Sequence, residues 1–157
     1  MNRPVAIRLG EDLCLTVGFL AENVNGEPYV LYGDRQLLNE YSEHTLFTIA
    51  SQNARRHFGE LSKRIPDDLR TPFLLDFADR ENTARLLTLL SHRKLKGRDD
   101  LVVGVPSRDR VVIASQQADL SALSDAVKAE HDKAVYPISG LLYSIRQAKI
   151  CEPLSTL

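Results

Sequence analysis

The stretch that decides the fold is Leu101-Val102-Val103-Gly104-Val105-Pro106-Ser107-Arg108-Asp109-Arg110-Val111-Val112-Ile113-Ala114. Two β-branched runs, residues 101–105 and 111–114, flank the short polar connection 106–110, which is typical of a β-hairpin with strands near 101–105 and 110–114. Both runs are apolar at successive positions rather than at alternate ones. Strands with that pattern are covered on both faces, so we expect the hairpin to lie centrally in its sheet.

A helix is expected directly after the hairpin, over residues 119–134. Its apolar residues recur at helical spacing: Leu120, Leu123, Val127 and Ala134. Tyr136-Pro137 should end it, because the residue before a proline disfavours the helical conformation. We expect a last strand over residues 141–145 and a frayed tail over residues 152–157.

Before the hairpin, the pattern predicts two helices. One spans residues 43–58, with Ser42 as its N-cap. The other spans residues 79–92, with Asp79 as a candidate cap. Between them, the polar residues 60–72 carry two prolines and are expected to form a surface loop. Residues 73–77 form either a strand or the beginning of the second helix.

The first third of the chain is β-rich. Strands are expected over residues 5–9, 13–21 and 28–32, and the Asn23-Val24-Asn25-Gly26 stretch is a strong turn signal because Asn and Gly tolerate positive φ. The order is then β-β-β-α followed by (β)-α-β-β-α-β. This order predicts an α+β fold, an antiparallel sheet with helices packed mainly on one face. A boundary at residues 60–72 would leave two very small halves, so we expect one domain over residues 1–157.

Composition and charge narrow the classes of function. The 157 residues are 43% hydrophobic and 26% charged, an ordinary globular composition. Twenty basic residues oppose twenty-one acidic ones, and the net charge of -1 disfavours nucleic acid and anionic membranes as partners. No stretch approaches the ~18 apolar residues of a membrane span, and the start at Met1 has no apolar leader. We therefore expect a cytoplasmic protein.

The chain resembles a known family over most of its length, from about residue 13 to 154. The resemblance is carried by Asp100-Leu101-Val102-Val103-Gly104-Val105-Pro106-Ser107-Arg108-Asp109 and by the closing Tyr136-Pro137-Ile138-Ser139. It is similar to the YtpQ-like bacterial family of unknown function (DUF1444), which often has Leu where this chain has Ile138. The resemblance implies a fold and a bacterial cytoplasmic setting. It implies no activity.

The connection Ser107-Arg108-Asp109-Arg110 is the first candidate site. In one interpretation, Arg108 or Arg110 clamps an anionic group with two parallel hydrogen bonds. In the other, which we favour, Pro106 presets the backbone while Ser107 and Asp109 bond to local amides and shape the turn. A nucleophilic Ser107 would need a histidine brought close by folding, and no sequence pattern points to one.

Three other groups of residues were weighed. The histidines His44, His57, His92 and His131 match no metal-ligand spacing, so no metal site is predicted. Cys14 and Cys151 are expected to be reduced thiols, although their sequence separation leaves a bridge open. The basic run from His92 to Arg98 fits a helix C-terminus ended by Gly97 better than an anion site. No glycine-rich phosphate loop is present, so no cofactor is predicted.

Two functions from different classes follow. The first is a non-enzymatic binding domain whose partner is another protein, because no catalytic cluster accompanies the apolar pattern. The second is an enzyme acting on a small anionic substrate, with residues 106–110 and a histidine brought in by folding. A pocket joining Arg108 or Asp109 to a histidine would favour the enzyme. An exposed apolar patch or a free sheet edge would favour the binding domain.

Overall fold

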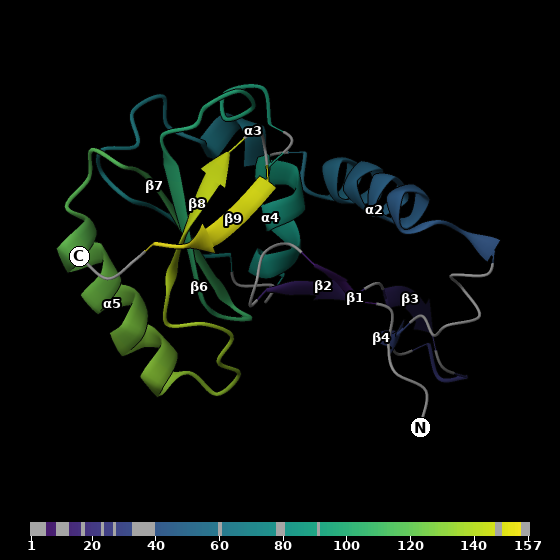
Figure 1. Ribbon diagram of the computed structural model, residues 1–157. Helices are drawn as coiled ribbons and strands as arrows, with labels where there is room; N and C mark the ends of the chain where they lie inside the picture. The colour runs from purple at the N-terminus through teal and green to yellow at the C-terminus, as the bar shows by residue number, and fades with distance from the viewer. Residues whose placement is uncertain are drawn as a thin grey trace.

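The computed structural model describes residues 6–8, 13–16, 18–22, 24–26, 28–32, 40–59, 61–77, 81–90, 92–146 and 149–154. Over these residues the elements run β1 (Ala6–Arg8), β2 (Cys14–Thr16), β3 (Gly18–Glu22), β4 (Pro28–Tyr32), α2 (Glu43–His57), α3 (Leu61–Arg64), β5 (Phe73–Leu75), α4 (Asn82–Leu90), β6 (Leu101–Ser107), β7 (Arg110–Ser115), α5 (Leu120–Lys133), β8 (Leu142–Arg146) and β9 (Lys149–Pro153). Figure 1 shows their arrangement.

The main sheet is antiparallel and has the order β5-β7-β6-β8-β9. Strand β6 lies in the middle, where Val103 is opposite Ile113 of β7 and Tyr143 of β8. All seven residues of β6 are buried. The predicted α+β class, the antiparallel sheet and the central hairpin are therefore confirmed, and residues 73–77, left open between strand and helix, provide the edge strand β5.

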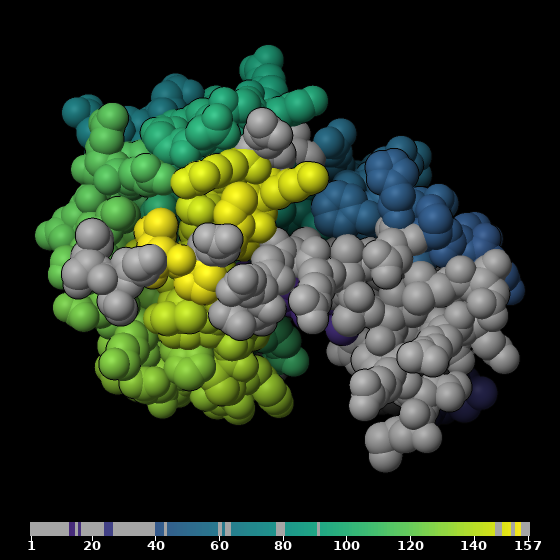
Figure 2. All heavy atoms as spheres, viewed as in Figure 1, coloured from purple at the N-terminus to yellow at the C-terminus, as the bar shows by residue number. Residues whose placement is uncertain are grey.

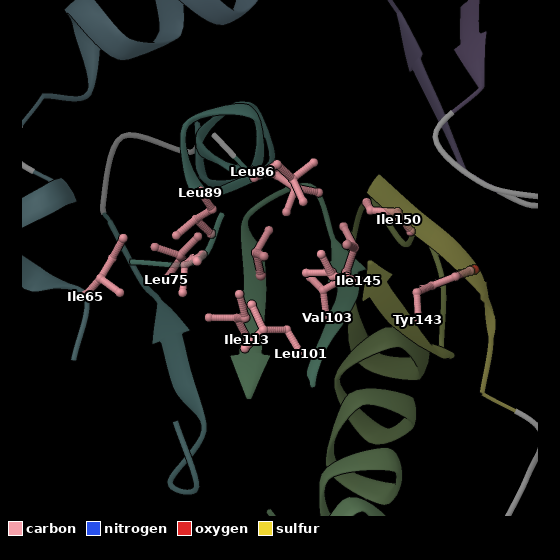
Figure 3. Packing of buried hydrophobic residues seen from close by; sticks show 14 of the residues in the cluster. Ile65, Leu75, Leu86, Leu89, Leu101, Val103, Ile113, Tyr143, Ile145 and Ile150 are labelled. Carbon is pink, nitrogen blue, oxygen red and sulfur yellow. The ribbon is translucent and has the colours of Figure 1, made fainter. Parts of the chain in front are cut away.

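The two faces of this sheet bury two separate apolar clusters, because successive residues of a strand point to opposite faces. On one face, Val103 of β6 packs in a cluster with Leu89 of α4 and Leu61 of α3. On the other, Val102 packs with Leu123 and Val127 of α5. Figure 1 shows α5 and α4 on opposite sides of the sheet, and Figure 3 shows the larger cluster. Helices were expected mainly on one face; α3 and α4 lie there, but α5 covers the other.

Gly104 lets α5 lie close to β6. A Cβ atom built at this position would be 2.6 Å from Cγ2 of Val127 and 3.0 Å from Cγ1 of Val112. Real Cβ atoms essentially never lie closer than 3.0 Å to another heavy atom, so the Val127 side chain on α5 would have to shift. The single glycine of the β-branched run is thus required by the helix that packs on it.

Helix α2 packs on α4 rather than on the sheet. Ala54 and Phe58 bury their side chains against Leu87, and the Arg85 guanidinium lies 4.4 Å from the Phe58 ring centroid. The predicted N-cap is confirmed, since the Ser42 hydroxyl accepts a hydrogen bond from the Thr45 amide at 3.2 Å. Helix α4 begins at Asn82, and the expected cap Asp79 lies outside the described residues.

Residues 60–72 are not simply a surface loop. Leu61–Arg64 is helical, and the side chains of Leu61, Ile65 and Leu69 are almost completely buried in the main core. The Leu69 carbonyl also accepts a hydrogen bond from the Ser115 amide at 2.8 Å. The stretch was expected to be a loop because of its prolines and charges. Its apolar residues Leu61, Ile65 and Leu69 are nevertheless spaced four apart and are buried together in the main core.

Both ends of the chain also differ from expectation. The predicted strand 13–21 provides β2 and β3, which pair with β1 and β4 in two separate two-stranded sheets. The turn signal before β4 is confirmed, with Gly26 at φ 77°.

At the C-terminal end, β9 pairs with β8, and the Leu154 amide donates to the Leu142 carbonyl at 2.8 Å. The expected fraying is therefore wrong for residues 152–154.

Gly104→Ala should lower the free energy of unfolding by about 1–3 kcal/mol, because the added methyl group overpacks the contact with Val127. Urea unfolding measures this change. Gly59→Ala is the matched control, since its Cβ would lie 3.5 Å from the nearest atom and its stability should change little. Equal stability of both variants would contradict the packing described for α5.

Candidate functional site

The four predicted site residues lie at the turn between β6 and β7. The buried Ser107 hydroxyl accepts a hydrogen bond from the Asp109 amide at 3.3 Å, as expected for a turn residue. We expected the Asp109 carboxylate to accept a hydrogen bond from a local backbone amide, but it does not. It accepts from Nε of Arg108 at 3.3 Å. Ser107 thus shapes the turn, whereas Asp109 balances a neighbouring charge.

Both guanidiniums of the turn have acidic partners. Nε of Arg110 lies 3.4 Å from Oε2 of Glu130 on α5. The Arg108 guanidinium, besides its contact with Asp109, lies 4.2 Å from the ring centroid of Tyr136. These side chains are about half exposed, so such ion pairs add little stability. They do leave the turn with balanced charge.

Asn82, which the sequence did not single out, anchors the turn to α4. Its fully buried side-chain amide donates to the carbonyls of Phe77 at 3.1 Å and Asp109 at 2.6 Å. Its amide oxygen accepts from the Phe77 amide at 3.2 Å. Asparagine is common at the start of a helix, so Asn82 gave no special signal. Its bond to the Asp109 carbonyl, 27 residues further along the chain, could not be predicted from the local sequence.

The segment 134–141, between α5 and β8, extends the pairing of β6. The Ile138 amide donates to the Pro106 carbonyl at 3.0 Å and the Ser139 amide to the Val105 carbonyl at 3.1 Å. The Tyr136 carbonyl accepts from the Arg108 amide at 3.1 Å. The backbone of this segment is therefore held against the central strand.

Four large apolar side chains of this same segment are exposed. The exposed fractions are 84% for Val135, 53% for Tyr136, 44% for Ile138 and 42% for Leu141. We call these four residues the apolar shelf. Figure 2 shows the yellow-green stretch at the surface beside the green of α5. Among the described residues, this is the segment in which exposed large apolar side chains gather most closely in sequence.

Next to the shelf, a cavity of about 270 Å³ lies between β2, α4 and the end of β6. Its described lining is mostly apolar, with two hydroxyls and one thiol: Leu13, Cys14, Thr16, Thr83, Ala84, Leu86, Val105 and Ile138. Ile138 belongs to both the cavity and the shelf. None of the four turn residues is among this lining.

No histidine is a hydrogen-bond, ion-pair or ring partner of the turn. The partners of residues 107–110 are one another, the Asn82 side chain on the Asp109 carbonyl, Glu130 and Tyr136. His57 lies 3.1 Å from Glu81, and His131 lies 3.1 Å from its neighbour Asp132. Within the described ranges, no group of three or more His, Cys, Asp or Glu side chains could hold a metal ion.

Two cations of the basic run after α4, Lys94 and Arg98, have acidic partners. Helix α4 ends at Leu90, so the run forms turns rather than a last helical turn, although Gly97 has the expected positive φ of 89°. Nζ of Lys94 lies 2.7 Å from Asp67, and Nη2 of Arg98 lies 2.7 Å from Asp100. These hydrogen bonds lower the pKa of both carboxyls. Burial, with Lys94 and Arg93 nearby, lowers the pKa of His92.

Cys14 and Cys151 are free thiols, as expected. No helix among the described residues is long and apolar enough to cross a bilayer. Comparisons of the chain with protein-family models, curated proteins and solved structures give no match. The resemblance to the DUF1444 family therefore stays a prediction.

Asn82→Ala should cost about 1–3 kcal/mol of unfolding free energy, because it leaves the buried groups of Phe77 and Asp109 without partners. Arg108→Ala and Ser107→Ala should change it by less than about 1 kcal/mol, since one contact is exposed and the other is a single local bond. Chemical denaturation of the three variants ranks these costs. A turn held mainly by Arg108 would reverse the order.

Acid should weaken the fold slightly through the ion pair between Asp68 and Arg70. The hydrogen bond from Arg70 lowers the pKa of Asp68 from 3.8 to about 2. A pKa lowered by folding stabilises the fold above the unfolded value, and this stability is lost as the pH falls from about 4 toward about 2. Because Asp68 and Arg70 are both more than half exposed, solvent screens this pair, and Asp68→Asn should flatten the pH dependence of the melting temperature in that window only slightly. An unchanged slope would show that this pair is not formed in solution.

Proposed function

We propose that this chain is a non-enzymatic protein-interaction domain of a bacterial cytoplasmic protein, with the apolar shelf as its docking surface. The observation that carries the proposal is the combination of a held backbone with outward apolar side chains over residues 134–141. The bacterial and cytoplasmic setting is what the family resemblance implies.

A segment of this kind favours binding because little conformational entropy is lost when a partner binds. The hydrogen bonds from Ile138 and Ser139 to β6 already restrict the backbone. Preorganisation of this sort reduces the entropic cost of association. Burying Val135 and Tyr136 against another apolar surface would then contribute most of the binding free energy, as central aromatic and aliphatic side chains do in interfaces.

The charges around the shelf support a protein partner. Arg108 and Arg110 are balanced by Asp109 and Glu130. Nucleic acids and anionic membranes bind to an excess of positive charge, which this rim does not offer. An apolar surface with a neutral polar rim is instead typical of protein interfaces.

The alternative, an enzyme acting on a small anionic substrate, has less support. Its candidate anion ligands, Arg108 and Arg110, already face acidic side chains within the turn and on α5. Its general base would be a histidine, and residues 107–110 have no histidine in contact.

The double variant Val135→Ser/Tyr136→Ser should lose partner binding about tenfold or more while keeping its melting temperature, because both side chains are exposed. The measurement is affinity capture from a bacterial host lysate followed by titration of the recovered protein. Val24→Ser is the matched control, since Val24 is fully exposed in the β3–β4 turn.

A recovered partner supports the proposal only if the control retains it and the double variant does not. A partner retained equally by both variants binds elsewhere, which would contradict the assignment of the shelf.

A further inference from the structure

The cavity beside the shelf is formed by elements that are far apart in sequence. Leu13, Cys14 and Thr16 come from β2 and the residue before it, Thr83, Ala84 and Leu86 from α4, and Val105 and Ile138 from the end of β6 and the segment paired with it. We propose that this cavity binds a small, uncharged, ring-sized organic molecule that carries one hydrogen-bonding group. This site goes beyond the proposed docking function, because its ligand is a small molecule rather than a protein.

The volume sets the size of the ligand. An engineered apolar cavity of about 150 Å³ accepts benzene, and pockets for drug-sized ligands begin at about 300 Å³. The cavity here measures about 270 Å³. It therefore has room for one ring with a short substituent and is too small for a nucleotide.

The lining sets the polarity of the ligand. The described lining residues include no charged side chain. From the described lining residues, an ionised ligand would gain no opposite charge to offset the hydration that it loses. The hydroxyls of Thr16 and Thr83 and the thiol of Cys14 can exchange hydrogen bonds with one polar group. An uncharged ring with a hydroxyl or a carbonyl group fits both conditions.

The cavity has a buried floor and an open rim. Leu13, Leu86 and Val105 are buried and belong to the main core cluster, so the floor is well packed. Cys14 and Ala84 are exposed, so a small molecule can enter from solvent on their side. The floor is preformed, and binding would need no rearrangement of the core.

Cys14 provides a direct reporter for occupancy. Its exposed thiol lies in the lining, whereas Cys151 lies in β9 and is not part of it. A ligand in the cavity should shield Cys14 from a thiol reagent and leave Cys151 unaffected. The two cysteines thus serve as test and internal control in one molecule.

The experiment measures the rate at which iodoacetamide alkylates each cysteine of the full chain, by peptide mass spectrometry, with increasing p-cresol. The thiolate displaces iodide, so each alkylation event marks one accessible sulfur. At a p-cresol concentration ten times its dissociation constant, the Cys14 rate should fall by about tenfold. The Cys151 rate should not change. The anion p-toluate, of similar shape, should not protect Cys14.

Ala84→Phe fills the cavity from its rim and should abolish the p-cresol dependence of Cys14. Ala122→Phe is the matched control, because each alanine is exposed and is the third residue of its helix. Protection by p-cresol in the wild type and in Ala122→Phe, but not in Ala84→Phe, supports the site.

The wild-type measurement alone can overturn the proposal, whether or not Ala84→Phe folds. Three results would overturn it. They are no protection of Cys14 by p-cresol, equal protection of Cys14 and Cys151, and protection of Cys14 by p-toluate equal to that by p-cresol. Val135 and Tyr136 are not among the described lining residues of the cavity. The double variant Val135→Ser/Tyr136→Ser should therefore retain p-cresol protection. A failure of the docking proposal therefore leaves this result unchanged, and the reverse also holds.

Discussion

The pairing of β6 with β7 and β8 is the interaction on which the rest of the structure depends. Val103 is opposite Ile113 on one side and Tyr143 on the other, so the strand has a partner along both edges. Each face of β6 buries a different cluster, with Leu89 of α4 on one side and Val127 of α5 on the other. Three further elements build on this strand. Strands β5 and β9 extend its sheet, and helix α2 packs on α4.

The same strand also determines what is left exposed. The carbonyls of Val105 and Pro106 are bonded to the amides of Ser139 and Ile138, so the chain that leaves α5 is drawn along the end of β6. The shelf side chains there keep exposed fractions of 42% to 84%. The proposed docking surface and the cavity behind Ile138 are thus consequences of where β6 ends.

The fold was largely predictable because its signals are local. The two β-branched runs, the cap at Ser42 and the apolar spacing of α5 each depend on residues close in sequence. The burial of Leu69, the division of strand 13–21 and the role of Asn82 could not be predicted, because their partners are distant. Apolarity of both strand faces already implied a helix on each side, and placing helices mainly on one face neglected that constraint. At the turn, Ser107 was predicted correctly. The shelf was not, because residues 135–141 look like an ordinary helix end followed by a strand.

The central claim is that β6 holds the backbone of the shelf while its four apolar side chains remain exposed. Native-state hydrogen exchange tests this claim most directly, residue by residue. The amides of Ile138 and Ser139 should exchange nearly as slowly as the amide of Val103, because all three are bonded to or within the central strand. Rapid exchange at Ile138 and Ser139, beside slow exchange at Val103, would show that the shelf is not preorganised and would contradict the account.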